Sequence, residues 1–400
     1  MPKTIVNIIT EDNPIPAYLF IKEMYKEGDK LMYISAKDTE DDLDALSDMF
    51  SVPAYNIEEI VLKHNMDEFT YEKICRTVKV ALKPDVNYCV NLAGGTRYMA
   101  LAVQQVFEDY NSTFYYVQVE ENMIVKSKFD DAINNNDDYF YPIRYRMKIA
   151  EYLRAHEINH DLSRYNHVPF FPKAKSVNMY NLFAYEDINS KYYDTLEALR
   201  NKCRNRRRVR IREVEESHGE EKPLVPRLSQ FLTRISFIPR TSGILSRQEI
   251  DYLIGGWFEE YVYYLVKRFI KPQDLALGAR IWRRNVHHNN ELDVIFTKGN
   301  KLFVIECKTG VSSDSLFNDI VYKACAIKEA LLGVSCFSYI FSLKKDDTNN
   351  LKRIAEMMDI TFLDHDIITK PRKRRKALAY IYVESRDGIN SLLNNPTKLY

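Results

Sequence analysis

The sequence predicts an α/β protein in which two domains are joined by a helical connector. Strand-like and helix-like segments alternate over the first 120 residues, a pattern typical of parallel βαβ units in a doubly wound sheet. Near residue 300, two apolar runs flank a Gly-Asn pair, which indicates a β-hairpin in a second domain. A chain of 400 residues with 46% hydrophobic composition can form two or three cores. We place the domains at 1–140, 141–240 and 241–400.

The first domain is expected to bind a ligand at one edge of its sheet. We expect strands at 4–10, 31–36, 57–62, 86–92 and 113–119, and helices at 17–26, 41–50, 67–82 and 97–109. Sheets of this kind bind ligands at the carboxyl ends of their strands. Two loops are therefore candidates, 10–14 after the first strand and 93–97 after the fourth.

The loop at 93–97 has features of a phosphate site. Gly94 and Gly95 allow the backbone to approach a ligand closely, and Thr96 can cap the next helix, whose free N–H groups attract phosphate. Arg97 can add a charge-assisted contact. The loop is neither a dinucleotide fingerprint nor a P-loop. On these residues alone, an ordinary strand-to-helix turn fits equally well.

The hairpin gathers charged side chains at one end. If the residues on either side of the Gly-Asn turn pair, Asp293 faces Glu306 and Glu291 faces Lys308, and all four lie on one face. Like charges directly opposite each other are destabilising, so the two acids need a cation. The other face is apolar and suits a core; it reads Leu292, Val294, Phe296, Leu302, Val304 or Ile305, and Cys307.

These acids suit a hard divalent metal. Mg²⁺ or Mn²⁺ takes oxygen ligands, and two carboxylates with a phosphate oxygen would be enough. A bound metal makes water easier to deprotonate and neutralises charge that develops on phosphorus. Lys308, two residues after Glu306, can orient that water or stabilise the transition state. An exposed hairpin with mixed charges is the alternative interpretation of the same residues.

A helix over 246–270 precedes the hairpin and carries two further acids. Ser246 and Glu249 form a capping box, and the apolar spacing that follows is helical. Glu259 and Glu260 lie within this stretch. On periodicity alone both are solvated side chains of an amphipathic helix. After the hairpin, a helix at 312–332 and a strand at 337–343 would complete an α/β/α core.

The order of acid helix, Asp strand and Glu-x-Lys strand resembles the PD-(D/E)xK nuclease superfamily, whose domain is restriction-endonuclease-like. The matching residues are Asp293, Glu306 and Lys308, with the helix motif Gly-Trp-Phe-Glu-Glu-Tyr-Val at 256–262. The resemblance implies that Glu259, which matches the family position better than Glu260, also points at the metal. It therefore implies metal ligands Glu259, Asp293 and Glu306, and a catalytic role for these three and Lys308.

The whole architecture resembles the CARF nuclease effectors of type III CRISPR systems. The N-terminal match is the Rossmann-like domain with Asn-Leu-Ala-Gly-Gly-Thr-Arg-Tyr-Met at 91–99, where the family usually has Lys in place of Arg97. The resemblance implies a homodimer that binds a cyclic oligoadenylate, most simply the tetra-adenylate, and thereby activates the nuclease. The implied ligand-binding residues are Thr10, Glu11, Asp12, Asn13, Ser35, Gly94, Gly95, Thr96 and Arg97. It also implies single-stranded DNA as substrate, with RNA cleavage or DNA nicking as alternatives.

Charge and composition restrict the remaining possibilities. The net charge is +1, but basic residues gather at 202–212 and again at 370–376, where they could follow a phosphate backbone. For the first run, compensation by the acidic residues that follow it is an equally good interpretation. The six cysteines form no CxxC pair, so neither zinc nor a disulfide framework is expected. No apolar run approaches a membrane span, and we expect a cytoplasmic protein.

Two rival functions remain open on sequence grounds. One is a restriction- or repair-type DNase that responds to a different nucleotide. The other is a ligand-responsive nucleic-acid-binding regulator whose nuclease fold has lost activity, although the intact Asp293, Glu306 and Lys308 argue against it.

Overall fold

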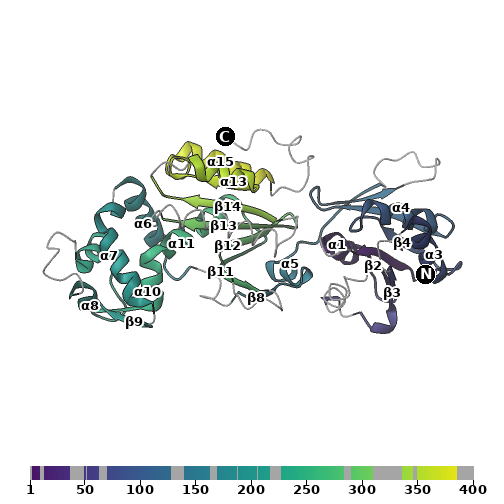
Figure 1. Cartoon of the computed structure of the whole chain (residues 1–400), viewed down its shortest axis with the longest axis horizontal. Coiled ribbons are helices and arrows are strands. Elements are labelled where there is room, and N and C mark those ends of the chain that lie inside the picture. Colours follow the sequence, from purple (N-terminus) through teal and green to yellow (C-terminus); the bar gives the residue numbers. More distant parts are fainter. Residues whose placement is uncertain are drawn as a thin grey trace.

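The computed structural model has an N-terminal α/β domain, a central sheet domain and a group of helices on the far side of that sheet (Figure 1). The structure describes residues 2–9, 13–36, 49–50, 52–62, 70–127, 139–162, 169–186, 188–204, 206–216, 227–282, 290–309, 336–345 and 349–384. Within these ranges, no helix combines the length and the apolar character needed to cross a membrane.

The N-terminal domain contains the expected doubly wound sheet. Its strand order is β3-β2-β1-β4-β5-β6-β7, parallel from β3 to β5. The strands are β1 (Thr4–Ile9), β2 (Lys30–Ala36), β3 (Ile57–Leu62), β4 (Tyr88–Asn91), β5 (Ser112–Gln118), β6 (Met123–Ser127) and β7 (Phe140–Pro142). The helices are α1 (Ile15–Met24), the 3₁₀ turn η2 (Ala54–Asn56), α3 (Tyr71–Ala81) and α4 (Arg97–Phe107). The helix expected at 41–50 lies almost entirely outside the described residues.

All five expected strands of this domain are confirmed, and β6 and β7 are additions to the prediction. They continue the sheet in antiparallel pairs, β5 with β6 and β6 with β7. The strand β7 leaves little trace in the sequence because it has three residues, all of them exposed. The importance of β6 and β7 lies in the turn between β5 and β6, which reaches the next domain.

The central domain is a six-stranded mixed sheet with the order β15-β14-β13-β12-β11-β8. The strands are β8 (Asn159–Asp161), β11 (Asp274–Trp282), β12 (Asn290–Lys298), β13 (Lys301–Lys308), β14 (Cys336–Ser342) and β15 (Ile360–Leu363). The hairpin β12–β13 and the strand β14 are confirmed. The expected helix at 312–332 lies outside the described residues.

Both faces of the hairpin are buried, whereas the sequence predicted one apolar face. Val294, Phe296 and Ile305 pack in a cluster with the helix α11 (Trp257–Phe269). The intervening residues Ile295 and Val304 pack in a second cluster with the helix α5 (Ile149–Ala155). Strands that are covered on both faces lose the alternation of apolar and polar residues, so the pattern indicated only one of the two apolar faces.

The expected connector at 141–240 does not lie as one body between the two domains. Only the part up to β8 does so. The helices beyond it lie on the opposite side of the central sheet from the N-terminal domain (Figure 1). They are α6 (Lys173–Tyr185), α7 (Ile188–Cys203), α8 (Ile211–Glu216) and α9 (Leu228–Arg234), with the ribbon of β9 (Arg208–Arg210) and β10 (Ile244–Ser246).

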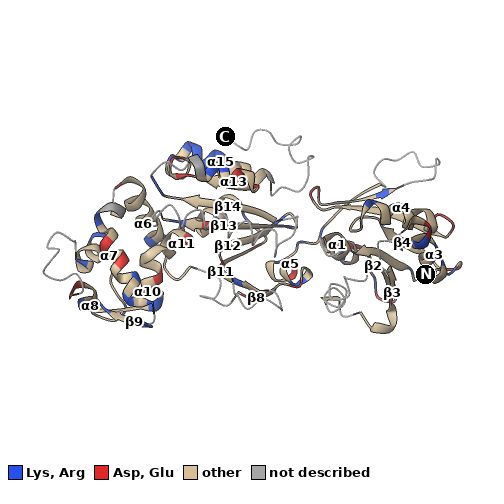
Figure 2. Cartoon of the chain, in the orientation of Figure 1, with Lys and Arg blue, Asp and Glu red and all other residues tan. Residues whose placement is uncertain are grey.

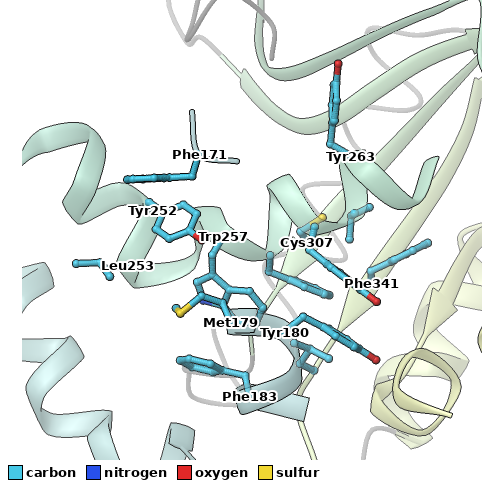
Figure 3. Packing of buried hydrophobic residues seen from close by; sticks show 14 of the residues in the cluster. Phe171, Met179, Tyr180, Phe183, Tyr252, Leu253, Trp257, Tyr263, Cys307 and Phe341 are labelled. Atoms are coloured by element: carbon cyan, nitrogen blue, oxygen red, sulfur yellow. The ribbon is translucent and has the colours of Figure 1, made fainter. Parts of the chain in front are cut away.

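These helices pack there because α11 presents aromatic residues on both of its sides. Figure 3 shows Trp257 of α11 beside Met179 and Phe183 of α6, with Cys307 of β13 close by. The ring of Tyr180 stacks on Tyr261 with centroids 3.9 Å apart. The helix α11 is therefore held between α6 and the sheet, and its position relative to the hairpin is well defined.

The long helix expected at 246–270 is interrupted. It consists of α10 (Arg247–Asp251), a π-helical turn η5 (Tyr252–Gly256) and α11. Gly255 has non-helical dihedral angles, and Gly256 leaves only 3.0 Å between the place of a Cβ and the carbonyl oxygen of Asp251. The capping box of Ser246 and Glu249 is confirmed. Two further helices, α14 (His365–Thr369) and α15 (Pro371–Glu384), follow β15, and α13 (Asn349–Met357) precedes it.

Candidate active site

The register of the hairpin is the one predicted from its turn. Lys298 pairs with Lys301, and the pairing continues to Val294 and Ile305. Beyond that point the side chain of Asp293 replaces a backbone partner. Its Oδ2 accepts a hydrogen bond of 2.6 Å from the backbone N–H of Cys307. This bond ties the first acidic strand to the second and fixes the orientation of the Asp293 carboxyl.

Three of the four charged residues expected on one face come together. Asp293 and Glu306 are both 8% exposed. The Nζ of Lys308 donates to Oε1 of Glu306 at 2.7 Å and lies 3.9 Å from Oδ2 of Asp293. One ammonium group therefore stands between two buried carboxyl groups.

Glu291, the fourth residue, is not part of this group. Its carboxylate lies 3.9 Å from the guanidinium of Arg280, across the β11–β12 pair, and its side chain is 37% exposed. The expected pairing of Glu291 with Lys308 is absent from the strand pairing of the described hairpin, which ends at Val294 and Ile305. Past that point Lys308 turns instead to the two buried acids.

The electrostatics of the group are those of acids in need of a cation. Burial raises the pKa of Asp293 well above its ordinary value, and the nearby charges of Glu306 and Glu259 raise it further. Burial alone would lower the pKa of Lys308, but Asp293 and Glu306 outweigh it and raise that pKa. Lys308 therefore stays protonated, and its single positive charge faces two carboxyl groups.

The two glutamates of α11 have different surroundings. Glu259 is half-buried, and its charge acts on Asp293 and on the thiol of Cys307. Glu260 is buried and points away. It accepts hydrogen bonds from the backbone N–H groups of Phe170 and Phe171, at 2.8 and 3.3 Å, and from Oγ of Ser176 at 2.9 Å. Glu260 thus holds the start of α6 on α11.

A Glu260→Gln substitution should stabilise the protein at neutral pH relative to wild type. Burial raises the pKa of Glu260 to about 7, from an ordinary value of 4.5. The folded state then binds a proton at Glu260 more tightly than the unfolded state does. The stability that this proton contributes to the wild type is present below pH 4.5 and is lost as the pH rises to about 7. Glutamine keeps the shape, can accept from Phe170 and Phe171, and can donate to Ser176, without a charge.

We expect the difference in free energy of unfolding between Glu260→Gln and wild type to change by up to about 3 kcal/mol, in favour of glutamine, between pH 5 and pH 8. Unfolding in urea at both pH values measures it. Glu291→Gln, at a half-exposed position, serves as the control. A difference that is constant with pH would show that Glu260 is ionised in the folded protein throughout.

The acidic group fits a divalent metal ion by the chemistry of its donors. Asp293 and Glu306 offer hard carboxylate oxygens, and a cation near Glu259 would relieve the repulsion that raises the Asp293 pKa. Within the described parts of the chain, however, no three acidic, histidine or cysteine side chains already stand in a metal-holding arrangement. Glu259 and the two strand acids would have to close around an ion.

The described parts of the two expected ligand loops, Asn13 in the first and Gly94 in the second, lie close together at the end of β1. A Cβ placed on Gly94 would meet the carbonyl oxygen of Ile8 at 2.6 Å and that of Asn13 at 3.9 Å. Gly94 also has φ +114°, so glycine is required there by both conformation and space. Thr96 caps α4 by accepting from the N–H of Met99 at 3.2 Å, as predicted.

The remaining ligand residues are placed in part. Thr96 and Arg97 are exposed at the start of α4. Ser35 is buried at the end of β2, next to Ile9, and its Oγ donates to the carboxylate of Glu59 at 3.0 Å. Gly95 packs against the side chain of Ile8, so its lack of a side chain serves the fold. Thr10, Glu11 and Asp12 lie outside the described residues.

The two basic runs differ in how many of their charges are already paired. In the C-terminal run, Lys370 and Lys373 both contact Asp366, and Arg374 donates to Tyr180 and to the carbonyl of Ile368. In the first run, Arg206 pairs with Glu213 at 2.6 Å. The next acid, Glu215, accepts from Ser229. Within this first run, the exposed arginines that have no acidic partner among the described residues are Arg204, Arg207, Arg208, Arg210 and Arg212. In the C-terminal run, Arg372, Arg375 and Lys376 are exposed and without an acidic partner in the same part of the structure.

Comparison with known proteins assigns both domains. The model of the Card1 CARF domain matches residues 4–152, and the model of the Card1-like endonuclease domain matches residues 246–375. Protein VC1899 from Vibrio cholerae has the same fold, with a TM-score of 0.71, 19% identity and coverage of 96% of this chain and 99% of its own. Can2 from Sulfobacillus thermosulfidooxidans, solved with cyclic tetra-adenylate, has a TM-score of 0.69, 19% identity and coverage of 94% and 99%. No curated protein sequence matches the chain.

The fold and the matched domains define a class of protein in which a CARF domain is joined to a restriction-endonuclease-like domain. The two models together match more than half of the chain. The chain belongs to the Card1-like family of CARF nucleases of type III CRISPR systems, and the two resemblances drawn from its motifs are confirmed.

Proposed function

We propose that this protein is a metal-dependent endonuclease that cyclic tetra-adenylate switches on and that cleaves single-stranded nucleic acid, DNA foremost. The observation that carries the proposal is the buried group of Asp293, Glu306 and Lys308 at the end of the hairpin, in a domain matched by the endonuclease model. Such a group costs stability in a fold that has no use for a cation or a phosphate.

Glu259, Asp293 and Glu306 would hold the ion, which we take to be Mg²⁺ or Mn²⁺. A metal bound there would supply a Lewis acid for a phosphodiester and a more acidic water. The Asp293 carboxyl is oriented for this role because the N–H of Cys307 occupies Oδ2 and leaves Oδ1 for the ion. Burial of both strand acids keeps their oxygens from being screened by solvent.

Lys308 acts through its charge. With a raised pKa it does not give up its proton at neutral pH, so it cannot serve as the general base. Its ammonium group, 2.7 Å from Glu306, is placed to donate a hydrogen bond to a phosphate oxygen or to the attacking water. Charge that develops on the phosphate in the transition state would then be stabilised by a donor that is already in position.

The CARF domain would bind the activator as a homodimer, across the loops that end β1 and β4. Support comes from the adjacent positions of Asn13 and Gly94 and from the exposed Arg97 at the start of α4, where backbone N–H groups and the guanidinium favour an anion. Can2, which has the same fold, was solved with cyclic tetra-adenylate.

The nucleic acid substrate would be held in part by the β9–β10 ribbon. In β9, Val209 is buried against Leu245 of β10, so Arg208 and Arg210 point outward. Ser246 at the end of β10 leads through α10 and η5 to Glu259, a helical path of about 20 Å. A strand a few nucleotides long can therefore contact the ribbon and reach the acidic group. Figure 2 shows the basic residues around β9 and α10.

Replacing Arg208 and Arg210 together by glutamine should weaken substrate binding and its dependence on salt. For a single strand, the slope of log K against log salt falls by roughly 0.7 for each phosphate that the protein no longer neutralises. Binding would be measured by fluorescence anisotropy of labelled single-stranded DNA. The matched control is Lys73→Gln with Arg76→Gln, an exposed pair on α3 of the CARF domain. An unchanged slope in the Arg208 and Arg210 variant would show that the ribbon does not bind the substrate.

Cleavage assays test the proposed function directly. We expect the full-length protein to cut single-stranded DNA only when cyclic tetra-adenylate and Mg²⁺ or Mn²⁺ are both present, and to lose activity in EDTA. Parallel reactions would contain single-stranded RNA, supercoiled plasmid, and other cyclic oligoadenylates. Cleavage that needs no activator would support a restriction- or repair-type nuclease. Binding without any cleavage would support a regulator.

A further inference from the structure

The tip of the catalytic hairpin is buried against the CARF domain. Gly299 and Asn300 form the turn between β12 and β13, and Asn300 is 0% exposed. A turn of this kind at the edge of a free domain would be hydrated. The acids Asp293 and Glu306 lie about 20 Å along the strands from this tip. The hairpin therefore has its chemistry at one end and the CARF domain at the other.

Asn300 has every polar group of its side chain engaged. Its Nδ2 donates to Oδ1 of Asn122 at 2.7 Å and to the carbonyl of Tyr145 at 3.0 Å. Its Oδ1 accepts from the N–H of Met147 at 2.8 Å. Asn122 returns a bond, because its Nδ2 donates to the carbonyl of Gly299 at 2.9 Å. Four hydrogen bonds thus join the tip of the hairpin to two segments, the turn at Asn122 and the stretch from Tyr145 to Met147.

Both asparagines have conformations that few side chains tolerate. Asn122 has φ 49° and is 2% exposed, and Asn300 has φ 57°. Asparagine is one of the residues that accept the left-handed region, and glycine would accept it more easily. The buried amides explain why these turns contain asparagine: each side chain joins its turn to the other domain.

The joint is close to the elements that would bind the activator. Asn122 lies in the turn between β5 and β6, and β5 is the neighbour of β4, which ends at the 93–97 loop. Glu23 near the end of α1 accepts from the N–H groups of Arg144 and Tyr145, at 2.7 and 2.6 Å. The helix α1 itself begins directly after the other candidate loop. Each loop is thus separated from the joint by one strand or one helix.

The same boundary is sealed by apolar packing. One cluster of buried residues runs from the CARF sheet through α5 to the nuclease sheet. Its members include Ile9 of β1, Val117 of β5 and Ile124 of β6, then Met147 and Leu153, then Ile295, Leu302 and Val304. A continuous close-packed core transmits displacement because it is not freely compressible.

We propose that Asn300 and Asn122 are positioning residues, which set the catalytic hairpin according to the state of the CARF domain. They touch neither metal nor substrate and act through the strands β12 and β13. Among the described residues, the helices α6 to α9 contribute neither to the four hydrogen bonds nor to the buried cluster at this boundary. The inference deepens the proposed function and rests on it for its effect on cleavage.

The test uses three variants of the full-length protein: Asn122→Gly, Asn300→Gly and the two combined. Glycine keeps the left-handed backbone and removes only the amide. Lys271→Gly is the matched control. Lys271 lies in the nuclease domain, as Asn300 does, and has a positive φ of 53°, but its side chain is exposed. One readout is the ratio of cleavage rates with and without cyclic tetra-adenylate. The other is hydrogen exchange of the hairpin amides on addition of cyclic tetra-adenylate.

We expect each single variant to lower the activation ratio about tenfold or more while cyclic tetra-adenylate still binds with near wild-type affinity. The double variant should lose about as much as either single variant, because both remove the same joint. A double variant that is activated as fully as wild type would overturn the proposal. So would equal losses in Lys271→Gly.

The hydrogen-exchange readout separates this proposal from the proposed function. If wild type cleaves nothing, but cyclic tetra-adenylate protects the hairpin amides and the variants abolish that protection, the joint stands and the nuclease assignment fails. If wild type cleaves on activation and the hairpin amides respond identically in all variants, the nuclease assignment stands and the joint fails.

Discussion

Glu306→Gln should reduce cleavage by at least about 10²-fold while the protein remains folded and binds its activator. Glutamine keeps the volume of the side chain but removes the negative charge that a divalent ion requires, and it leaves Lys308 with Asp293 as its remaining acidic neighbour. Lys308→Met should have a comparable effect for a different reason, since it preserves both carboxylates and removes the positive charge. Single-turnover cleavage with saturating cyclic tetra-adenylate measures both.

The hairpin provides a control for this experiment. Glu291 lies on the same strand as Asp293, two residues earlier, and pairs with Arg280 outside the acidic group. Glu291→Gln should therefore cleave at a rate close to wild type. Thermal unfolding of all three variants would show that the fold is intact. Substantial cleavage by both Glu306→Gln and Lys308→Met would contradict the assignment of the site.

The hairpin was predictable because local rules determine it. A Gly-Asn turn defines the register from Lys298 and Lys301 to Val294 and Ile305, and this register brings Asp293 and Glu306 to the same end of the hairpin. The register rule failed beyond Val294, where the side chain of Asp293 replaces a backbone partner by accepting from Cys307. Counting residues along the strands cannot show that a side chain replaces a backbone hydrogen-bond partner. For this reason the predicted pairing of Glu291 with Lys308 was wrong.

The distinction between Glu259 and Glu260 depended on tertiary structure. Adjacent residues on a helix point about 100° apart, and periodicity shows only that one of them faces inward. The inward residue is Glu260, which is a poor candidate for a metal because three donors from the start of α6 already occupy it. The motif resemblance selects Glu259, and the charge of Glu259 raises the pKa of Asp293.

The path between the two domains was not predictable. Residues 141–240 looked like a connector because they lie between the two motifs in sequence, but most of them pack beyond the nuclease sheet. The real contact involves Asn122 and Asn300, which in sequence are ordinary turn residues. Their burial, with exposures of 2% and 0%, and their hydrogen bonds between the domains distinguish them from the asparagines of a surface turn.

Activator and substrate should each tighten the binding of the other. A ligand shifts a conformational equilibrium only by its differential affinity for the two states, so an activator that changes the nuclease must bind better to the state that binds substrate. A coupling of about 1 to 3 kcal/mol corresponds to a roughly 5- to 150-fold change in affinity. We expect saturating single-stranded DNA to increase the affinity for cyclic tetra-adenylate by a factor in this range.

The measurement requires a protein that binds substrate without cutting it. Lys308→Met in Ca²⁺ is suitable, because both strand carboxylates remain and Ca²⁺ accepts oxygen ligands. Calorimetric titration with cyclic tetra-adenylate would be carried out with and without single-stranded DNA. Arg97→Ala in the same background should bind the activator more weakly in both titrations, since it removes a cation from the exposed start of α4.

Adding Asn300→Gly to this background shows whether the coupling passes through the hairpin tip. If the joint carries the coupling, the affinity for cyclic tetra-adenylate alone should stay the same. The factor by which DNA increases that affinity should then fall toward one. If the increase survives, the coupling passes through contacts elsewhere, such as a rearrangement of the dimer that leaves the hairpin tip in place. If DNA has no effect even with Asn300 intact, the activator acts on the chemical step rather than on substrate binding.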